Sequence, residues 1–392
     1  MYDPRKSPIF AKKNQMDVPF VYGKIVAAED FTDRKNETAK LLANIGSLTN
    51  TAIISPRRWG KSSLVSKVIG IAESSGKDHL FVRMNIFKCG DEQEFYQTYA
   101  KSIMSQVSST LENMMSNAKE FISSLLPKVA VSDPAGQYEL SFGLDVKSNP
   151  IGEDILDLPQ RIATKKGKKI IVCIDEFQQI GEFADSVRFQ KILRNHWQEQ
   201  SDVAYILYGS KKHMMLNIFG EYNSPFYRFG DIIFLPKISN KDWSDYIVDR
   251  FSKTGKSISP DVASYLAERV DNHSYYVQQL AQACWLRSTV SCSESVVDSA
   301  LESIMDSLNL QFLNTMDSLT EKQRNYLCAV ADGVEHFSST ETLSRYKLGT
   351  NGNVRIMRDA LRKRDIIDVE GKRVFIQDPM FLLWLKTQYR TF

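Results

Sequence analysis

The side chains best suited to phosphate chemistry stand in two short stretches of the sequence. The first is Gly60-Lys61-Ser62, between an apolar run at 52–54 and an amphipathic segment at 64–69. The second is Asp175-Glu176, which closes the apolar run 170–174. A loop between a strand and a helix presents backbone N–H groups to a phosphate, and a lysine there adds positive charge. Two carboxylates after a buried strand can hold a divalent cation and deprotonate a water molecule.

The first stretch departs from the full phosphate-loop pattern, G-x-x-x-x-G-K-[ST]. Ser55 stands where that pattern has its first glycine, which eases the turn out of the strand. The half that is present supplies the charge and the metal ligand, because Lys61 would reach the β- and γ-phosphates and Ser62 would bind Mg²⁺. The alternative is an exposed basic loop before a helix. The loop residues expected to bind nucleotide are Pro56, Arg57, Arg58, Trp59, Gly60, Lys61, Ser62 and Ser63.

The second stretch has the Walker B pattern. A continuous apolar run is typical of a strand buried on both faces of a parallel sheet, and such sheets bind ligands at the carboxyl ends of their strands. Asp175 would hold Mg²⁺, directly or through water, and Glu176 would act as the catalytic base. A buried strand followed by two surface acids is the alternative. The order and setting of the two stretches together favour a nucleotide site.

Two further positions could contact a nucleotide. Ser210 follows the apolar run 203–208 at another carboxyl end, where ATPases place a polar residue that senses the γ-phosphate; a helix cap is the alternative. Arg228 precedes the apolar run 232–236 and could reach a γ-phosphate in its own chain or a neighbour's, as a catalytic arginine. A surface arginine in a loop is the alternative reading of Arg228.

Composition sets broad limits on the class of protein. The chain has 392 residues, of which 43% are apolar and 25% charged, enough for two or three domains with sizeable cores. Lys plus Arg number 50 and Asp plus Glu 47, and this balance neither requires nor excludes nucleic acid. The five cysteines are scattered without a C-x-x-C pair, which fits a reducing compartment and disfavours zinc. With no apolar segment typical of a signal or a membrane span, we expect a cytoplasmic protein without a membrane partner.

Strands alternate with helices across 50–236, which predicts an α/β fold with a parallel sheet, that is, a P-loop NTPase core. From residue 240 the pattern becomes helical only, as expected of a lid. The expected domains are an extended lead-in at 1–28, the core at 29–237 with a hairpin insertion near 128–146, the lid at 238–310 and a winged helix at 311–392.

Three helical segments and a Glu-Gly hairpin turn predict the C-terminal winged helix. Its third helix carries Arg355, Arg358 and Arg362 on one face by helical spacing. A winged helix places this helix in the major groove of DNA, where arginines contact phosphates and guanines. The alternatives are a solvated basic face or a surface for an acidic protein. Double-stranded DNA and a protein therefore both remain candidate partners.

With these elements placed, the sequence resembles the archaeal-type P-loop ATPases of the STAND branch, related to the origin-recognition AAA+ proteins. The resemblance rests on Arg57 to Leu64, on Phe31, Arg34 and Glu37 near the first helix, and on His273 to Gln278 in the lid. It implies that Phe31 and Arg34 lie on the adenine side and that His273 lies near the nucleotide. Asp33 stands where the family has glycine, and the lid motif lacks the family's glycine and proline.

From these residues we predict an ATP/ADP-binding protein that hydrolyses ATP slowly with Mg²⁺ and changes shape between nucleotide states. Two other hypotheses remain open. In one, the protein is a DNA-binding regulator with a structural nucleotide. In the other, the hairpin near 128–146 and the winged helix make it a protein-docking scaffold.

Overall fold

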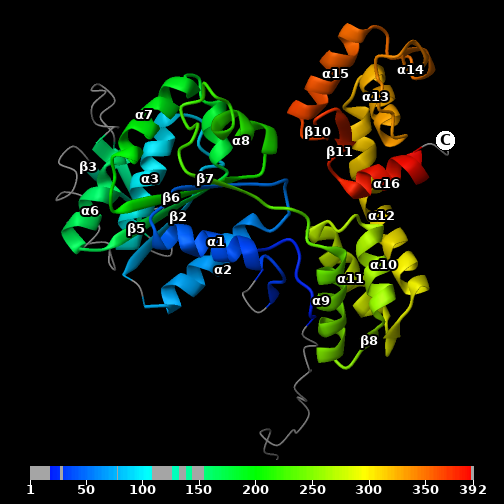
Figure 1. The fold of residues 1–392 in the computed structure, drawn as a ribbon, viewed down its shortest axis with the longest axis horizontal. Helices are drawn as coiled ribbons and strands as arrows, with labels where there is room; N and C mark the ends of the chain where they lie inside the picture. The colour runs from blue at the N-terminus through cyan, green and yellow to red at the C-terminus, as the bar shows by residue number, and fades with distance from the viewer. Residues whose placement is uncertain are drawn as a thin grey trace, which may run out of the picture.

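The computed structural model describes residues 18–26, 30–76, 78–107, 126–131, 138–143 and 154–389. It places an α/β core beside a stack of helices that ends in the C-terminal domain (Figure 1). Parts of three sequence predictions fall outside the described residues. These are 1–17 and 27–28 of the lead-in, 108–125 of the segment 92–126 whose apolar spacing predicts a helix, and 132–137 and 144–146 of the hairpin.

The core is a five-stranded parallel sheet in the order β2-β5-β6-β1-β7. Its strands are β1 (Thr51–Ile54), β2 (His79–Asn85), β5 (Lys169–Asp175), β6 (Val203–Gly209) and β7 (Asp231–Phe234). β5 and β6 are buried along nearly their whole length, as their unbroken apolar sequences predict. Because every pair is parallel, the loops after β1, β5 and β6 open at the same edge of the sheet.

Alternate residues of each strand face the two helical layers. Ile53 and Ile206 pack with α1 (Lys35–Gly46) and α2 (Lys61–Ser74) on one face. Val172 and Leu207 pack on the other face. That face is covered by α3 (Glu92–Val107), α6 (Leu158–Lys166), the 3-10 helix η2 (Phe177–Glu182), α7 (Ser186–Gln198) and α8 (Lys212–Phe219). This two-sided burial fixes the strand register, since a slip of one residue would exchange the faces.

A separate antiparallel pair, β3 (Leu126–Val131) and β4 (Tyr138–Gly143), lies where the hairpin insertion was expected. The first helix, α1, has Arg34 as its N-cap, without a side-chain cap bond, and not the preceding Asp33, although aspartate is the residue type favoured at that position. Asp33 and Arg34 both have left-handed backbone angles, with φ of 56° and 64°, so the chain turns sharply there before entering the helix.

The lid is a helical body with its own apolar core. It consists of α9 (Asn240–Lys253), α10 (Pro260–Arg269), α11 (Ser274–Arg287), α12 (Glu294–Asp317) and the short strands β8 (Ser257–Ile258) and β9 (Ser291–Cys292). Phe20 is buried in this core, and Gln282 Nε2 donates to its carbonyl at 2.9 Å. The lead-in is therefore anchored on the lid before the chain enters the α/β core.

The C-terminal domain has the order expected of a winged helix: three helices, a hairpin and a closing helix. These are α13 (Glu321–Ala331), α14 (Thr340–Arg345), α15 (Asn351–Lys363), β10 (Ile367–Glu370), β11 (Arg373–Ile376) and α16 (Pro379–Thr387). The domain boundary expected at 310–311 falls inside α12, a continuous helix that also packs on α16 through Phe312. Lid and winged helix therefore share one apolar core.

Candidate functional site

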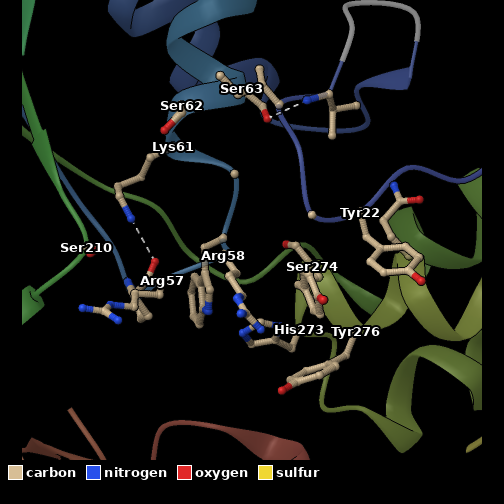
Figure 2. A pocket seen from close by; sticks show the side chains of 18 of the residues that line it. Tyr22, Arg57, Arg58, Lys61, Ser62, Ser63, Ser210, His273, Ser274 and Tyr276 are labelled. Carbon is tan, nitrogen blue, oxygen red and sulfur yellow. Dashed lines mark hydrogen bonds between the residues drawn. The ribbon is translucent and has the colours of Figure 1, made fainter. Parts of the chain in front are cut away.

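A pocket of about 870 Å³ opens at the carboxyl ends of the core strands. Its walls come from the loop after β1, the 18–26 segment, the start of α11 and the C-terminal domain. Figure 2 shows Arg58 of the loop reaching toward His273 of the lid, with Tyr276 nearby, while Lys61 points back toward the loop backbone beside Arg57. The sequence placed the loop and the lid histidine here, but gave no signal for the 18–26 segment.

The loop ends at Gly60, whose φ of 91° is a left-handed conformation that a side chain would disfavour. α2 begins at the next residue and points its N-terminus at the pocket, so its unpaired N–H groups can bind an anion. Lys61 Nζ donates to the carbonyls of Ser55 and Pro56 at 3.2 and 3.0 Å, and lies 3.4 Å from Ser55 Oγ. Ser55, the residue that breaks the sequence pattern, thus accepts from the loop's own lysine.

Burial lowers the pKa of Lys61 to about 8, against the opposing effect of the nearby Glu176 and Asp175 carboxylates. Added negative charge stabilises the charged form of a buried ammonium. The site is therefore electrostatically suited to a polyphosphate.

Ser62 and Asp175 come together across the sheet edge. Ser62 Oγ donates to Asp175 Oδ2 at 3.2 Å, while the Glu176 backbone N–H donates to Asp175 Oδ1 at 2.8 Å. Burial and then the Glu176 charge raise the pKa of Asp175, an effect that a bound cation would reverse. A hydroxyl and a carboxylate are the oxygen donors that Mg²⁺ takes alongside substrate phosphates, so this donor pair fits magnesium. No group of three His, Cys, Asp or Glu side chains that could hold a metal occurs within the described residues.

Glu176 leaves β5 with φ of 56° and directs its carboxylate toward the end of β6. Its Oε2 accepts from Ser210 Oγ at 3.0 Å, so the hydroxyl at the end of β6 lies beside the expected base. The strand order explains this contact, because Glu176 follows β5, Ser210 follows β6, and these two strands are neighbours in the sheet.

The expected adenine-side residues also line the pocket, but they are already bonded to protein. Arg34 is buried, and its guanidinium donates to the Pro236 and Trp59 carbonyls at 2.6 and 3.4 Å. Lys67 Nζ lies 4.2 Å from the centre of the Phe31 ring. Arg34 therefore joins the loop to the end of β7, a supporting role that the sequence motif alone does not reveal.

His273 is buried at the N-cap of α11, with Nδ1 lacking a hydrogen-bond partner within the described residues. Burial, reinforced by Lys237 and Arg58, lowers its pKa to about 4, so its ring is neutral near pH 7. Arg58 also stacks on Tyr275, 4.4 Å from the ring centre. The loop and the lid thus meet through aromatic and cationic side chains.

The winged helix adds contacts that the sequence did not foresee. Asp378 accepts from Tyr276 Oη at 2.7 Å and also caps α16. Arg57 of the loop lies 3.9 Å from Asp365, which follows α15. Nearby, Lys212 of α8 pairs with Asp368 at 3.2 Å and Glu370 at 2.6 Å. The hairpin of the winged helix is therefore docked on the core beside the pocket.

Arg228, which could reach a γ-phosphate in its own chain or a neighbour's, lies outside the pocket that its own chain forms. A contact with a neighbour's γ-phosphate stays a prediction, with a surface arginine as the alternative. The residue lies just before β7, and Asp231 pairs with Thr51 at the amino end of β1. The Asp231 N–H donates to the Asn50 carbonyl, again at that amino end. The loop 55–60 follows the opposite, carboxyl end of β1, so the sheet separates Arg228 from this loop.

The three arginines of α15 differ in exposure. The Arg355 side chain is 81% exposed and that of Arg358 39%, and both lie near Asp359, at 3.7 and 3.5 Å. Arg362 is more enclosed, with its Nε buried. None of the three lines the pocket. The basic face expected to contact DNA is thus partly neutralised by Asp359, with Arg355 at its exposed end.

Two family models match the sequence. Residues 35–205 match the model of a predicted AAA-ATPase, and residues 310–387 match that of a probable winged helix domain. No protein with a curated description matches significantly. Among the described residues, no helix has the length and apolar character needed to cross a bilayer.

Solved structures share the fold over almost the whole chain. The Walker-type ATPase of Pyrococcus abyssi has a TM-score of 0.64 at 16% identity, covering 94% of this chain and 99% of that one. The ORC2 protein of Aeropyrum pernix, solved as ADPNP–ADP complexes, has a TM-score of 0.57 at 12% identity, covering 95% and 96%. Its ADP form gives 0.53 at 13% identity, covering 94% and 96%. The expected fold class, a P-loop core with a C-terminal winged helix, is confirmed.

Proposed function

We propose that the protein binds ATP with Mg²⁺ and hydrolyses it slowly. The match of residues 35–205 to the predicted AAA-ATPase model and the fold shared with a Walker-type ATPase support this proposal. The observation that carries the proposal is the meeting of Lys61, Ser62 and Asp175 at one pocket edge, with Ser62 Oγ 3.2 Å from Asp175 Oδ2. A related fold solved with ADPNP and ADP supports an adenine nucleotide as the ligand.

In this proposal each residue of the loop and the sheet edge has one task. The α2 N-terminus and Lys61 bind the phosphates, and Lys61 exchanges its contacts with the Ser55 and Pro56 carbonyls for phosphate oxygens. Ser62 and Asp175 would hold Mg²⁺, which neutralises charge on the phosphates. Glu176 accepts a proton from the attacking water, and Ser210 donates to the Glu176 carboxylate.

We further propose that the nucleotide controls how the winged helix docks. Arg57 belongs to the nucleotide loop yet lies 3.9 Å from Asp365, so a phosphate and Asp365 would compete for one guanidinium. Tyr276 lines the pocket and donates to Asp378 of the winged helix. A ligand shifts a conformational equilibrium only through contacts that differ between the states, and these two pairs supply such contacts.

The test of hydrolysis is ATP turnover by the wild type, Glu176→Gln and Lys61→Ala. We expect Glu176→Gln to bind ATP but lose turnover, and Lys61→Ala to lose affinity. Equal turnover in all three proteins would remove the catalytic assignment. The test of the switch is the distance between spectroscopic labels on α8 and β11 with ADP and with a non-hydrolysable ATP analogue. The same distance in both states would exclude it.

DNA binding is a second candidate function. Arg355 favours it, because this arginine is 81% exposed near the start of α15, the part of the helix that lies outside the pocket. The wing is held on α8 by Lys212, so docking restricts the use of the hairpin on DNA. This candidate predicts duplex affinity that falls steeply with salt. Binding unaffected by Arg355→Ala together with Arg358→Ala would count against it.

A further inference from the structure

The carboxylate of Glu176 is held by a second donor, from a residue to which no role is assigned above. Gln178 Nε2 donates to Glu176 Oε2 at 2.5 Å, the same oxygen that accepts from Ser210 Oγ at 3.0 Å. No hydrogen bond to Glu176 Oε1 is seen in the described part of the chain, and Glu176 lines the pocket. The two donors thus fix one carboxylate oxygen and leave the other available.

Gln178 is itself fixed in place. It is 2% exposed, within the 3-10 helix η2, and its Oε1 is buried without a hydrogen-bond partner within the described residues. A buried amide oxygen without a hydrogen-bond partner costs free energy. Packing alone therefore does not explain why an amide side chain stands at position 178. An amide that carries this cost while its N–H group meets a carboxylate is suited to orienting that carboxylate.

Gly209 provides the space for this amide. A Cβ added at Gly209 would lie 1.9 Å from Gln178 Oε1 and 2.9 Å from Met215 Sδ. Any side chain at 209 would therefore displace Gln178 from Glu176. The Gly209-Ser210 pair at the end of β6 thus has two tasks: the glycine admits the Gln178 amide, and the serine donates directly to Glu176.

We propose that Gln178 is a positioning residue for the proposed ATP hydrolysis. Together with Ser210 it holds Glu176 Oε2, so that Oε1 faces the attacking water. A base misplaced by a fraction of the hydrogen-bond length loses much of its effect, because proton transfer depends on geometry. The inference rests on the hydrolysis proposed above, and it adds a residue that does not touch nucleotide.

The decisive variant is Gln178→Met, which keeps the length of the side chain and removes its donor. We expect kcat to fall about tenfold to a hundredfold, as for loss of one hydrogen bond to a charged group, with KM and melting temperature nearly unchanged. Gln179→Met is the matched control, since the neighbouring Gln179 donates to the exposed Glu182 instead. An unchanged kcat in Gln178→Met overturns the inference.

A double-mutant cycle that combines Gln178→Met with Glu176→Gln tests whether Gln178 acts through Glu176. In the Glu176→Gln background, Gln178→Met should have no further effect on the residual rate. A further loss of the same size would show a general structural role and overturn the inference. A rise in KM as the main effect would do the same.

A crystal structure of Gln178→Met gives a readout that does not need turnover. We expect the Glu176 carboxylate to rotate away from its present position, with its hydrogen bond to Ser210 lengthened or lost. A carboxylate in the same place overturns the inference even if the wild type hydrolyses ATP. A wild type that binds ATP without hydrolysing it overturns the proposed function, while the crystal structure still decides whether Gln178 positions Glu176.

Discussion

Ser62 and Asp175 lie 113 residues apart in the chain, yet the Ser62 hydroxyl donates to the Asp175 carboxylate at 3.2 Å. The contact joins the end of β5 to the start of α2, the helix that follows β1, and β5 and β1 lie on either side of β6 in the sheet. These two side chains would hold a divalent cation, which would supply positive charge for the phosphates.

The first prediction follows from that pair. Mg²⁺ should raise the ATP affinity of Ser62→Ala by about tenfold less than it raises that of the wild type. The ATP affinities of the two proteins in EDTA should be nearly equal. Calorimetric titrations with Mg²⁺ and with EDTA measure the two affinities. Ser66→Ala is the control, because Ser66 lies one turn further along α2 and contacts the exposed Arg83 instead. If both variants responded equally, Ser62 would not be a magnesium ligand.

The second prediction concerns pH and Lys61. The empty protein holds the pKa of this lysine at about 8, whereas phosphates favour its charged form. Binding above pH 8 therefore requires proton uptake, and ATP affinity should fall with rising pH by up to about tenfold per unit. Titrations between pH 7 and 9.5, in buffers of different ionisation enthalpy, measure both the affinity and the proton uptake.

Lys61→Arg supplies the comparison for that experiment, because a guanidinium stays charged throughout this range. Its ATP affinity should be weaker but nearly independent of pH. Parallel curves for the wild type and Lys61→Arg would assign the pH dependence to another group.

The third prediction concerns acid stability and His273. Its pKa is about 4 in the folded protein, below the ordinary value of 6.5, so the unfolded chain binds more protons between these values. The free energy of unfolding should therefore fall as pH drops through 6.5 toward 4. For this one group the loss is about 1.5 kcal/mol between pH 6.5 and 5.

Between pH 6.5 and 5, the free energy of unfolding of His273→Gln should fall by about 1.5 kcal/mol less than that of the wild type. Chemical denaturation at several pH values measures both. His336→Gln is the matched control on an exposed histidine. If His273→Gln and the wild type lost stability in parallel, the ring would not be held neutral by burial.

The fourth prediction concerns docking of the winged helix. Lys212→Glu places a third negative charge beside Asp368 and Glu370, so the domain should separate from α8 and the radius of gyration in solution scattering should rise. The adjacent Lys211→Glu is the control, because Lys211 pairs with Glu182, a residue of the α/β core, and not with the winged helix. Adding Glu370→Lys to Lys212→Glu should restore the docked form.

High salt should weaken the docked form of the wild type only modestly, because Asp368 is buried in the contact. A scattering profile that is the same for Lys212→Glu and the wild type would contradict a role for these pairs in docking.

Much of the architecture followed from local sequence pattern. Unbroken apolar runs predicted the buried strands that became β5 and β6, and the loop before α2 predicted a phosphate site at a strand end. The Glu-Gly turn predicted the hairpin of β10 and β11. These signals are local because a strand, a turn or a helix N-terminus is set by neighbouring residues.

The errors and omissions came from contacts between distant segments. The parallel pairing of β1 with β7 places Arg228 at the amino edge of the sheet, away from the pocket of its own chain, so only a neighbour's γ-phosphate stays within the prediction. Gln178 gave no signal, because its meeting with Glu176 depends on the missing side chain of Gly209 on a neighbouring strand. Arg34 carried a family motif, but its carbonyl partners at Trp59 and Pro236 were invisible in the sequence.

By itself, the sequence determined which residues could bind phosphate and magnesium, since that capacity lies in residue type and in the local strand–loop–helix order. Only the tertiary structure decided which of them meet. The order β2-β5-β6-β1-β7 brings Lys61, Asp175 and Ser210 to one edge, and the docked winged helix adds Asp365 and Asp378 to it. Side-chain proximity across a hundred residues depends on strand order and packing, which no local pattern encodes.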